Sequence, residues 1–167
     1  AAAALRAINT VDTKRALEIA KSLEQSDNSN ITGSVADVYA KEGDENYQQY
    51  FETKLRSITG VGKYSMFYYY ANYLSRMDKN VVLKGIQTIE EQGMATESHF
   101  LTNAAKGSLK RIAKLFDDKK KRTQSQSADG GSAKAEQQEK ISQYDMIVSA
   151  ANDAVERLGK KSKAPKQ

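Results

Sequence analysis

The sequence predicts an all-α protein built as a HEAT-like helical-repeat array, an α-α superhelix closed at its C-terminal end by an antiparallel helix hairpin. Apolar side chains recur three and four positions apart in segments of roughly 10 to 16 residues, which is helical spacing. The only proline is Pro165, so no proline interrupts a helix at any earlier position. Helices this short cannot bury an apolar stripe alone, and they must therefore stack on their neighbours.

The first two complete helices have clear start and stop signals. The first begins at Asp12 or Thr13, either of which is a good N-cap, and it places Ala16 and Ala20 on one face. Polar residues 26–30 break it. The second helix, from Ile31, ends at Gly43, which we expect in the left-handed conformation that closes many helices.

Aromatic residues dominate the middle of the chain. Residues 46–58 form a helix, and 59–62, with two glycines, form a flexible turn. The aromatic content of 63–77 favours a strand, but the apolar spacing and the length of about four turns decide for a helix. Its stripe consists of Tyr64, Phe67, Tyr68, Ala71, Leu74 and Met77.

The C-terminal third is expected to contain a long helix, a break and a closing helix. Asp78 caps a helix that ends at Gly93, and a longer helix runs from about Thr96. We assign 1–116 to the helical-repeat domain, 117–134 to a flexible low-complexity linker, 135–159 to a C-terminal helix packing on the array and 160–167 to a disordered basic tail.

Composition and charge indicate a folded, soluble chain. Apolar residues make up 39% and charged residues 28%, and no apolar run approaches the roughly 20 residues that span a bilayer. Residues 106–167 hold 15 basic and 8 acidic side chains, against 11 and 13 in 1–105. The basic run 119–122 and the tail lysines could contact phosphates, but no aromatic residues are interleaved with them, so we favour a solvated linker and tail.

Catalytic and metal-binding chemistry has few candidates. Cysteine is absent and His99 is the only histidine, so no H-E-x-x-H zinc helix exists in this chain, and we expect His99 at the surface. The acidic pairs 44–45, 90–91 and 117–118 point in different directions along their helices. The run 60–63 lacks the full spacing of a phosphate loop. We therefore predict no catalytic, cofactor-binding or metal-binding residue.

Tyrosines are the only side chains that we single out as a possible domain or partner interface. Tyr68, Tyr69 and Tyr70 cover about 200° of helix surface, so at least one must lie at a rim with its hydroxyl in water. With Tyr47 and Tyr50 they are candidate anchors, since aromatic residues with a polar tip dominate interface energetics. Partly buried packing between repeats is the alternative for all five.

Several segments resemble the helical C-terminal domain of bacterial aminopeptidase N-like enzymes, which are zinc metallopeptidases of the gluzincin family. They are Ala16-Leu-Glu-Ile-Ala-Lys-Ser-Leu-Glu24, Ile31 with Ser34-Val-Ala-Asp-Val-Tyr-Ala-Lys-Glu-Gly-Asp44, Tyr50-Phe-Glu-Thr-Lys-Leu55, Lys63-Tyr64 and the helix from Tyr70 to Leu74. The likeness spans about residues 1–116. It implies that the zinc ligands and the catalytic Glu belong to a separate upstream domain, while the helical repeats pack over that domain and help to enclose its peptide cavity.

The resemblance implies a chain without peptidase activity and without a cofactor, whose parent enzyme binds zinc. Its partner would be the upstream catalytic domain of the same polypeptide, and it would meet peptide substrate only indirectly. The start at Ala1, inside an expected helix, suggests a piece of a longer polypeptide. The resemblance fits a bacterial protein of the cytoplasm or of the cell envelope equally well, so the compartment stays open. Two alternatives stay open: a free-standing helical-repeat adaptor with a protein partner and, less favoured, a nucleic-acid-binding module that uses the basic C-terminal third.

Overall fold

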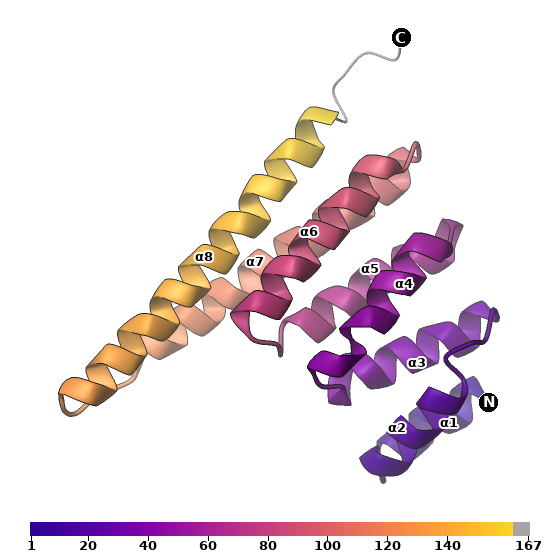
Figure 1. Cartoon of the computed structure of the whole chain (residues 1–167), viewed down its shortest axis with the longest axis horizontal. Coiled ribbons are helices and arrows are strands. Elements are labelled where there is room, and N and C mark those ends of the chain that lie inside the picture. The colour runs from indigo at the N-terminus through magenta and orange to yellow at the C-terminus, as the bar shows by residue number, and fades with distance from the viewer. Residues whose placement is uncertain (162–167) are drawn as a thin grey trace. The chain divides into compact units, whose positions relative to one another are not determined.

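A computed structural model describes residues 1–161 and contains eight α-helices, one short 3-10 helix and no strand in that range (Figure 1). The predicted all-α class is confirmed. The chain divides into two compact units, Ala1–Met77 and Asp78–Gln167. The boundary lies just before the helix Lys79–Ala95, for which Asp78 is the N-cap residue, without a capping hydrogen bond from its side chain.

The first unit contains five α-helices in two groups. Helices α1, α2 and α3 contact one another, and α5 contacts both α3 and α4. The elements are α1 (Ala2–Asn9), α2 (Thr13–Ser22), α3 (Ser29–Glu42), η1 (Glu45–Tyr47), α4 (Gln48–Ser57) and α5 (Gly60–Leu74). The predicted N-cap of α2 is confirmed, since the Asp12 carboxylate accepts a hydrogen bond of 2.9 Å from the backbone N–H of Arg15.

Aromatic rings fill the core of the first unit. Phe51 of α4 stacks on Tyr70 with ring centroids 5.2 Å apart and also contacts Tyr73 at 4.8 Å and Tyr50 at 5.6 Å. Phe51, Tyr70 and Tyr73 are fully buried. Such ring clusters bury large apolar areas, so this core holds α4 against α5.

The buried face of α5 differs from the stripe that the sequence predicts. Phe67, Ala71 and Leu74 are buried as expected, but Tyr64 and Tyr68 are about half exposed, and Tyr70 and Tyr73 take their places in the core. The difference arises because α3 and α4 contact α5 from two sides. The buried arc is therefore wider than one narrow stripe.

Gly43 ends α3 for a reason other than backbone handedness. Its φ of −67° is ordinary, so the expected left-handed conformation is wrong. A Cβ there would lie 2.7 Å from the carbonyl oxygen of Tyr39 and 3.0 Å from the ring of Tyr47. Glycine is needed for this close approach. The left-handed residue of the first unit is Gly60, φ +59°, which begins α5, so residues 60–62 are helical and not the expected flexible turn.

The second unit is a bundle of three helices, each of which contacts the other two. They are α6 (Lys79–Ala95), α7 (His99–Ser125) and α8 (Gly131–Lys161). Gln137 near the start of α8 donates hydrogen bonds to the carbonyls of Thr123 and Gln126, and Lys120 of α7 pairs with Asp145 further along α8. The pair is therefore antiparallel, as the sequence predicts for the closing hairpin.

The flexible linker expected over 117–134 is largely helical. Residues up to Ser125 continue α7, residues from Gly131 belong to α8, and only the turn between them is not helical. Ion pairs compensate the basic run, because Lys120 and Lys121 lie 3.7 and 2.6 Å from the Asp117 carboxylate. Composition alone did not predict this pairing, which needs the helical spacing of three and four residues.

Lys160 and Lys161, which were expected in a disordered basic tail, belong to α8. Lys161 is the last residue of α8, and its ammonium group donates to the carbonyls of Gly93, Met94 and Thr96 at the end of α6. These carbonyls have no partner inside α6, and a cation suits the negative end of the helix dipole. Residues 162–167 lie outside the described part of the chain.

Gly93 lies inside α6 and does not end it. The helix continues to Ala95, and Gly93 is buried where α6, α7 and α8 meet. A Cβ at this position would lie 2.7 Å from the Ala105 Cβ and 3.0 Å from the Leu158 side chain. The glycine therefore allows the three helices to approach closely.

Candidate functional site

The five candidate interface tyrosines have three different environments. Tyr70 is fully buried, and its hydroxyl accepts a hydrogen bond from the Gln48 amide at 3.0 Å and donates to Glu52 at 3.4 Å. Tyr70 therefore packs inside the first unit and exposes no surface of its own to a partner. Tyr68 is 48% exposed, which confirms that one of the three consecutive tyrosines is at the surface.

Tyr47 and Tyr50 are half-buried beside Tyr39. The Tyr39 ring lies 4.3 Å from the Tyr47 ring and 5.1 Å from the Tyr50 ring, and the Tyr39 hydroxyl donates to the Glu24 carboxylate. The Tyr50 hydroxyl donates to the Thr32 carbonyl at 3.3 Å. Burial and the neighbouring Glu24 charge raise the pKa of Tyr39 and Tyr50 far above the ordinary tyrosine value. Both hydroxyls thus stay protonated and act as donors.

These rings border a polar depression that we name the tyrosine groove. Its volume is about 470 Å³. It is lined by Glu24, Gln25, Asp27, Asn46, Tyr47, Gln49, Tyr50, Thr53, Lys54 and Ser57. Two carboxylates and one ammonium group give it a slightly acidic character.

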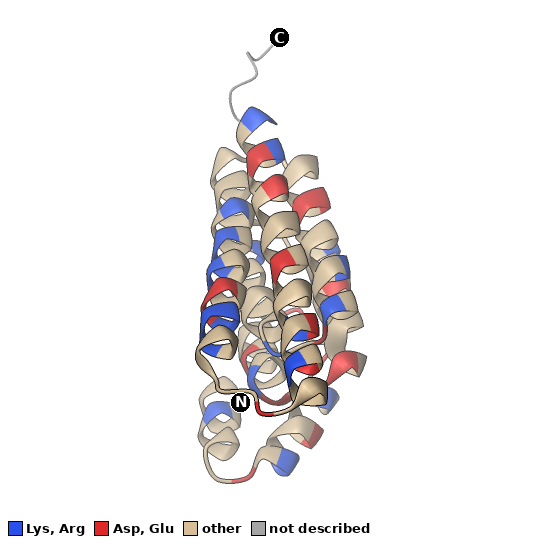
Figure 2. Cartoon of the chain, turned by 90° about the vertical axis from the view of Figure 1, so that its left-hand side faces the viewer, with Lys and Arg blue, Asp and Glu red and all other residues tan. Residues whose placement is uncertain are grey.

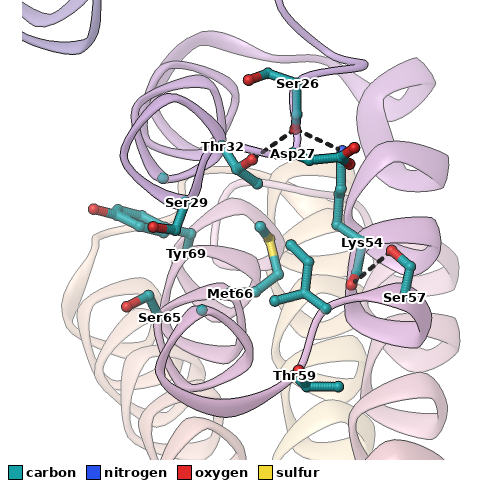
Figure 3. A pocket seen from close by; sticks show the side chains of 13 residues that line it. Ser26, Asp27, Ser29, Thr32, Lys54, Ser57, Thr59, Ser65, Met66 and Tyr69 are labelled. Atoms are coloured by element: carbon teal, nitrogen blue, oxygen red, sulfur yellow. Dashed lines mark hydrogen bonds between the residues drawn. The ribbon is translucent and has the colours of Figure 1, made fainter.

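A second depression in the same unit, the hydroxyl cleft, lies between the start of α3, the end of α4 and the start of α5 (Figure 3). Its volume is about 350 Å³. It is lined by Ser26, Asp27, Ser29, Thr32, Gly33, Lys54, Ser57, Ile58, Thr59, Gly62, Ser65, Met66 and Tyr69. It shares Asp27, Lys54 and Ser57 with the tyrosine groove, so the two depressions adjoin.

The hydroxyl cleft is organised around the Ser26 carbonyl. The Thr32 hydroxyl donates to this oxygen at 3.0 Å and the Lys54 ammonium at 3.3 Å, as the dashed lines in Figure 3 show. Lys54 is the one basic side chain of the cleft, and its ammonium group is engaged with the Ser26 carbonyl. The arrangement suits hydrogen bonding to a polar chain, and its volume lies in the range of small-ligand pockets.

One face of α5 forms an apolar stripe consisting of Val61, Tyr64 and Tyr68. Their exposed fractions are 75%, 46% and 48%, at the three-and-four spacing of one helical face. Gly62, Ser65 and Tyr69, each one position further along α5, line the hydroxyl cleft. The apolar stripe therefore runs beside the cleft on the same helix.

The remaining candidates are dispersed over the two units. His99 is exposed at the first position of α7. Of the acidic pairs, Asp44 caps η1, and the Glu90 carboxylate forms an ion pair with the Arg157 guanidinium at 2.5 Å. Among residues 1–161, no three His, Asp or Glu side chains are arranged to hold a metal ion. Within the same range, none of the helices combines the length and the apolar character needed to cross a membrane.

The tyrosine groove and the hydroxyl cleft were not predicted from the sequence. The polar break 26–30 carried the available signal, because Ser26, Asp27 and Ser29 come from it. Lys54 comes from another helix, and only the tertiary structure brings it to Ser26. Comparisons of this chain with protein-family models, with curated proteins and with solved structures find no match.

Proposed function

We propose that this chain is the non-catalytic C-terminal helical-repeat domain of a larger zinc aminopeptidase, where it packs on the catalytic domain and helps to cover the peptide cavity. The sequence resemblance over residues 1–116 suggests the family. The all-helical architecture and the short connections between α1 and α6 fit a degenerate, HEAT-like repeat.

The observation that carries the proposal is the apolar stripe of α5. Tyr64 and Tyr68 pair an apolar ring with a polar tip, a combination that is enriched at protein interfaces. Because Val61 is 75% exposed at one end of the stripe, the free chain presents an apolar surface on an otherwise well-packed helix. The catalytic domain of the same polypeptide is the occupant that we assign to it.

The position of the hydroxyl cleft supports the second part of the proposal. A domain seated on the apolar stripe borders the cleft, since residues of the two surfaces alternate along α5. Serine and threonine hydroxyls with the Lys54 ammonium can bond the carbonyl and amide groups of a peptide. In this position the first unit contributes a polar wall to a peptide-binding space and takes no part in the bond cleavage.

The first test is the gene upstream of Ala1. The proposal requires an H-E-x-x-H helix in the same reading frame, and a gene without one overturns it. If the gene lacks such a helix and the chain binds a stable protein partner, the result supports the free-standing adaptor, the alternative that the sequence leaves open.

The second test is made in the full-length enzyme. Tyr64→Ser with Tyr68→Ser should weaken the attachment of the helical domain, which limited proteolysis and hydrogen exchange at α5 detect, and should change KM for peptides more than for a one-residue amide substrate. Met146→Ser is the matched control, because Met146 is a 50% exposed apolar side chain of α8. Equal effects of the tyrosine pair and of Met146→Ser contradict the docking role of the apolar stripe.

A further inference from the structure

The positive charge of the described chain is concentrated on one helix. α7 holds eight Lys and Arg and two Asp, a formal charge of +6, whereas α6 and α8 each hold equal numbers of acidic and basic residues. Figure 2 shows basic residues following one another along α7, interrupted by one acidic segment. These residues were expected to belong partly to a helix ending at 116 and partly to a linker, so a continuous line of charge along one helix was not predicted.

Four of the lysines share one face of α7. Residues three or four positions apart on a helix point in similar directions. This face consists of His99, Asn103, Lys106, Lys110, Lys114, Asp117 and Lys121. At a rise of about 1.5 Å per residue it is roughly 33 Å long, and Lys106, Lys110 and Lys114 follow one another at about 6 Å.

The N-terminal half of this face borders a groove against α8, which we name the basic groove. Its volume is about 680 Å³. It is lined by His99, Asn103, Lys106, Lys110, Val155, Glu156, Gly159 and Lys160. Val155 is half-buried, and a Cβ added at Gly159 would meet no atom within 4 Å. The α8 side of the groove thus has an apolar strip and open space.

Lys106 and Lys110 are the uncompensated charges of the groove. Lys114 and Lys121 pair with Asp118 at 2.7 Å and Asp117 at 2.6 Å. Lys160 pairs with Glu156 at 2.8 Å. Among residues 1–161, Lys106 and Lys110 have no acidic partner, although like charges four positions apart destabilise a helix. An anionic ligand would remove this repulsion.

We propose that the basic groove binds an acidic helix of a protein partner. Carboxylates four positions apart on such a helix repeat at about 6 Å, the spacing of Lys106, Lys110 and Lys114. Small or apolar residues between the carboxylates fit against Val155 and Gly159. The added helix pairs with α7 and α8 and extends the three-helix unit to a four-helix bundle.

Several features favour carboxylates over nucleic acid. The face carries four lysines and no arginine, the residue whose planar fork suits phosphates best. No tyrosine, phenylalanine or tryptophan lines the basic groove, and His99 is the one ring among its lining residues, so successive bases have no row of rings on which to stack. Glu156 and Asp117 interrupt the positive charge. These acidic residues would repel a continuous phosphate backbone, whereas a partner helix with separate carboxylates can avoid them.

The test uses the whole chain and a labelled synthetic helix with glutamate at every fourth position and alanine between. Its glutamine counterpart, single-stranded DNA and duplex DNA are the comparison probes, and fluorescence anisotropy is measured at low and at physiological salt. We expect the glutamate helix to bind at least tenfold more tightly than the glutamine helix. Equal binding of the two helices overturns the proposal, and so does tighter binding of either DNA than of the glutamate helix.

Variants locate the site. Lys106→Glu with Lys110→Glu should weaken binding of the glutamate helix at least tenfold. Lys134→Glu with Lys140→Glu is the matched control, because it makes the same change in net charge at two exposed positions of α8 outside the groove, and it should change binding less than threefold. Circular dichroism confirms that each variant is folded. Equal losses for the two variants show an attraction to overall charge only and overturn the groove assignment.

Discussion

Replacing Gly93 with alanine should destabilise the second unit, although the same change normally stabilises a helix interior. Alanine is favoured over glycine by about 0.8–1.0 kcal/mol in a helix. The new methyl carbon, however, would lie 2.7 Å from the Ala105 Cβ and 3.0 Å from Leu158. Carbon atoms pack at about 3.5–4.0 Å, so α6 and α7 must separate, and overpacking of this kind costs about 1–3 kcal/mol. We expect a net loss of about 1 kcal/mol in the free energy of unfolding.

Gly107→Ala is the matched control. Gly107 is an exposed position of α7 where an added Cβ meets no atom within 4 Å, so the helix preference acts alone and the variant should gain about 0.5–1 kcal/mol. Urea unfolding, combined with hydrogen exchange of α6 and α7 amides to isolate the second unit, measures both changes. The clash also predicts that Ala105→Gly is less harmful in the Gly93→Ala background than alone. Additive effects, or equal stabilisation by the two alanine variants, would refute the close approach at Gly93.

Three further outcomes follow from contacts in the two units. Lys161→Met should lower the free energy of unfolding by about 1–2 kcal/mol, because it removes the charged donor from the carbonyls at the end of α6. Lys160→Met is the control: Lys160 forms an exposed ion pair, so its loss should change the free energy of unfolding by less than about 0.5 kcal/mol in the same denaturation assay. Tyr70→Phe should cost about 1–3 kcal/mol, because a buried hydrogen bond from the Gln48 amide to the Tyr70 hydroxyl and one from that hydroxyl to Glu52 are lost. A thermal melt unchanged from that of the wild-type chain would contradict this. The pKa values of Tyr39 and Tyr70 are raised in the folded chain, so the unfolded chain releases these protons first as the pH rises. The free energy of unfolding is therefore unaffected below the ordinary tyrosine pKa of 10.0 and falls above it, by about 1.4 kcal/mol per tyrosine and pH unit. Urea midpoints that do not fall between about pH 9 and pH 11 would exclude the effect.

The positions of the helices follow from the sequence because their signals are local. The spacing of Ala16 and Ala20 and the cap at Asp12 require only neighbouring residues, and both are confirmed. The antiparallel pairing of α7 with α8 was also predictable, since both helices carry matching apolar stripes. Their continuation through residues 117–125 was not, because the composition of that segment suggests a linker, while the ion pair of Lys120 with Asp145 of α8 depends on the fold.

Glycines and tyrosines show where sequence reasoning fails. Gly43 and Gly93 were both expected to end a helix because glycine often follows a helix in the left-handed conformation. Each glycine is instead required by a close contact, Gly43 with Tyr47 across a turn and Gly93 with Leu158, which is distant along the chain. The three consecutive tyrosines had to include a surface position, yet only the packing of α3 and α4 on α5 decides that Tyr68 is exposed and Tyr70 is buried. Surfaces assembled from several helices, such as the hydroxyl cleft and the basic groove, have only a partial local signal, because residues distant along the chain complete them.

The bond between Lys161 and the end of α6 has a consequence for biosynthesis. It joins residues 68 positions apart, and α8 as a whole closes on a helix that leaves the ribosome much earlier. All contacts within the first unit, in contrast, are complete once Met77 has emerged. Because the ends of a chain must be brought together before distant contacts stabilise it, the first unit can fold during translation, while the faces of α6 and α7 that pack on α8 stay uncovered until α8 has been synthesised. A nascent chain stalled within α8 should therefore expose the apolar faces of α6 and α7 to chaperones.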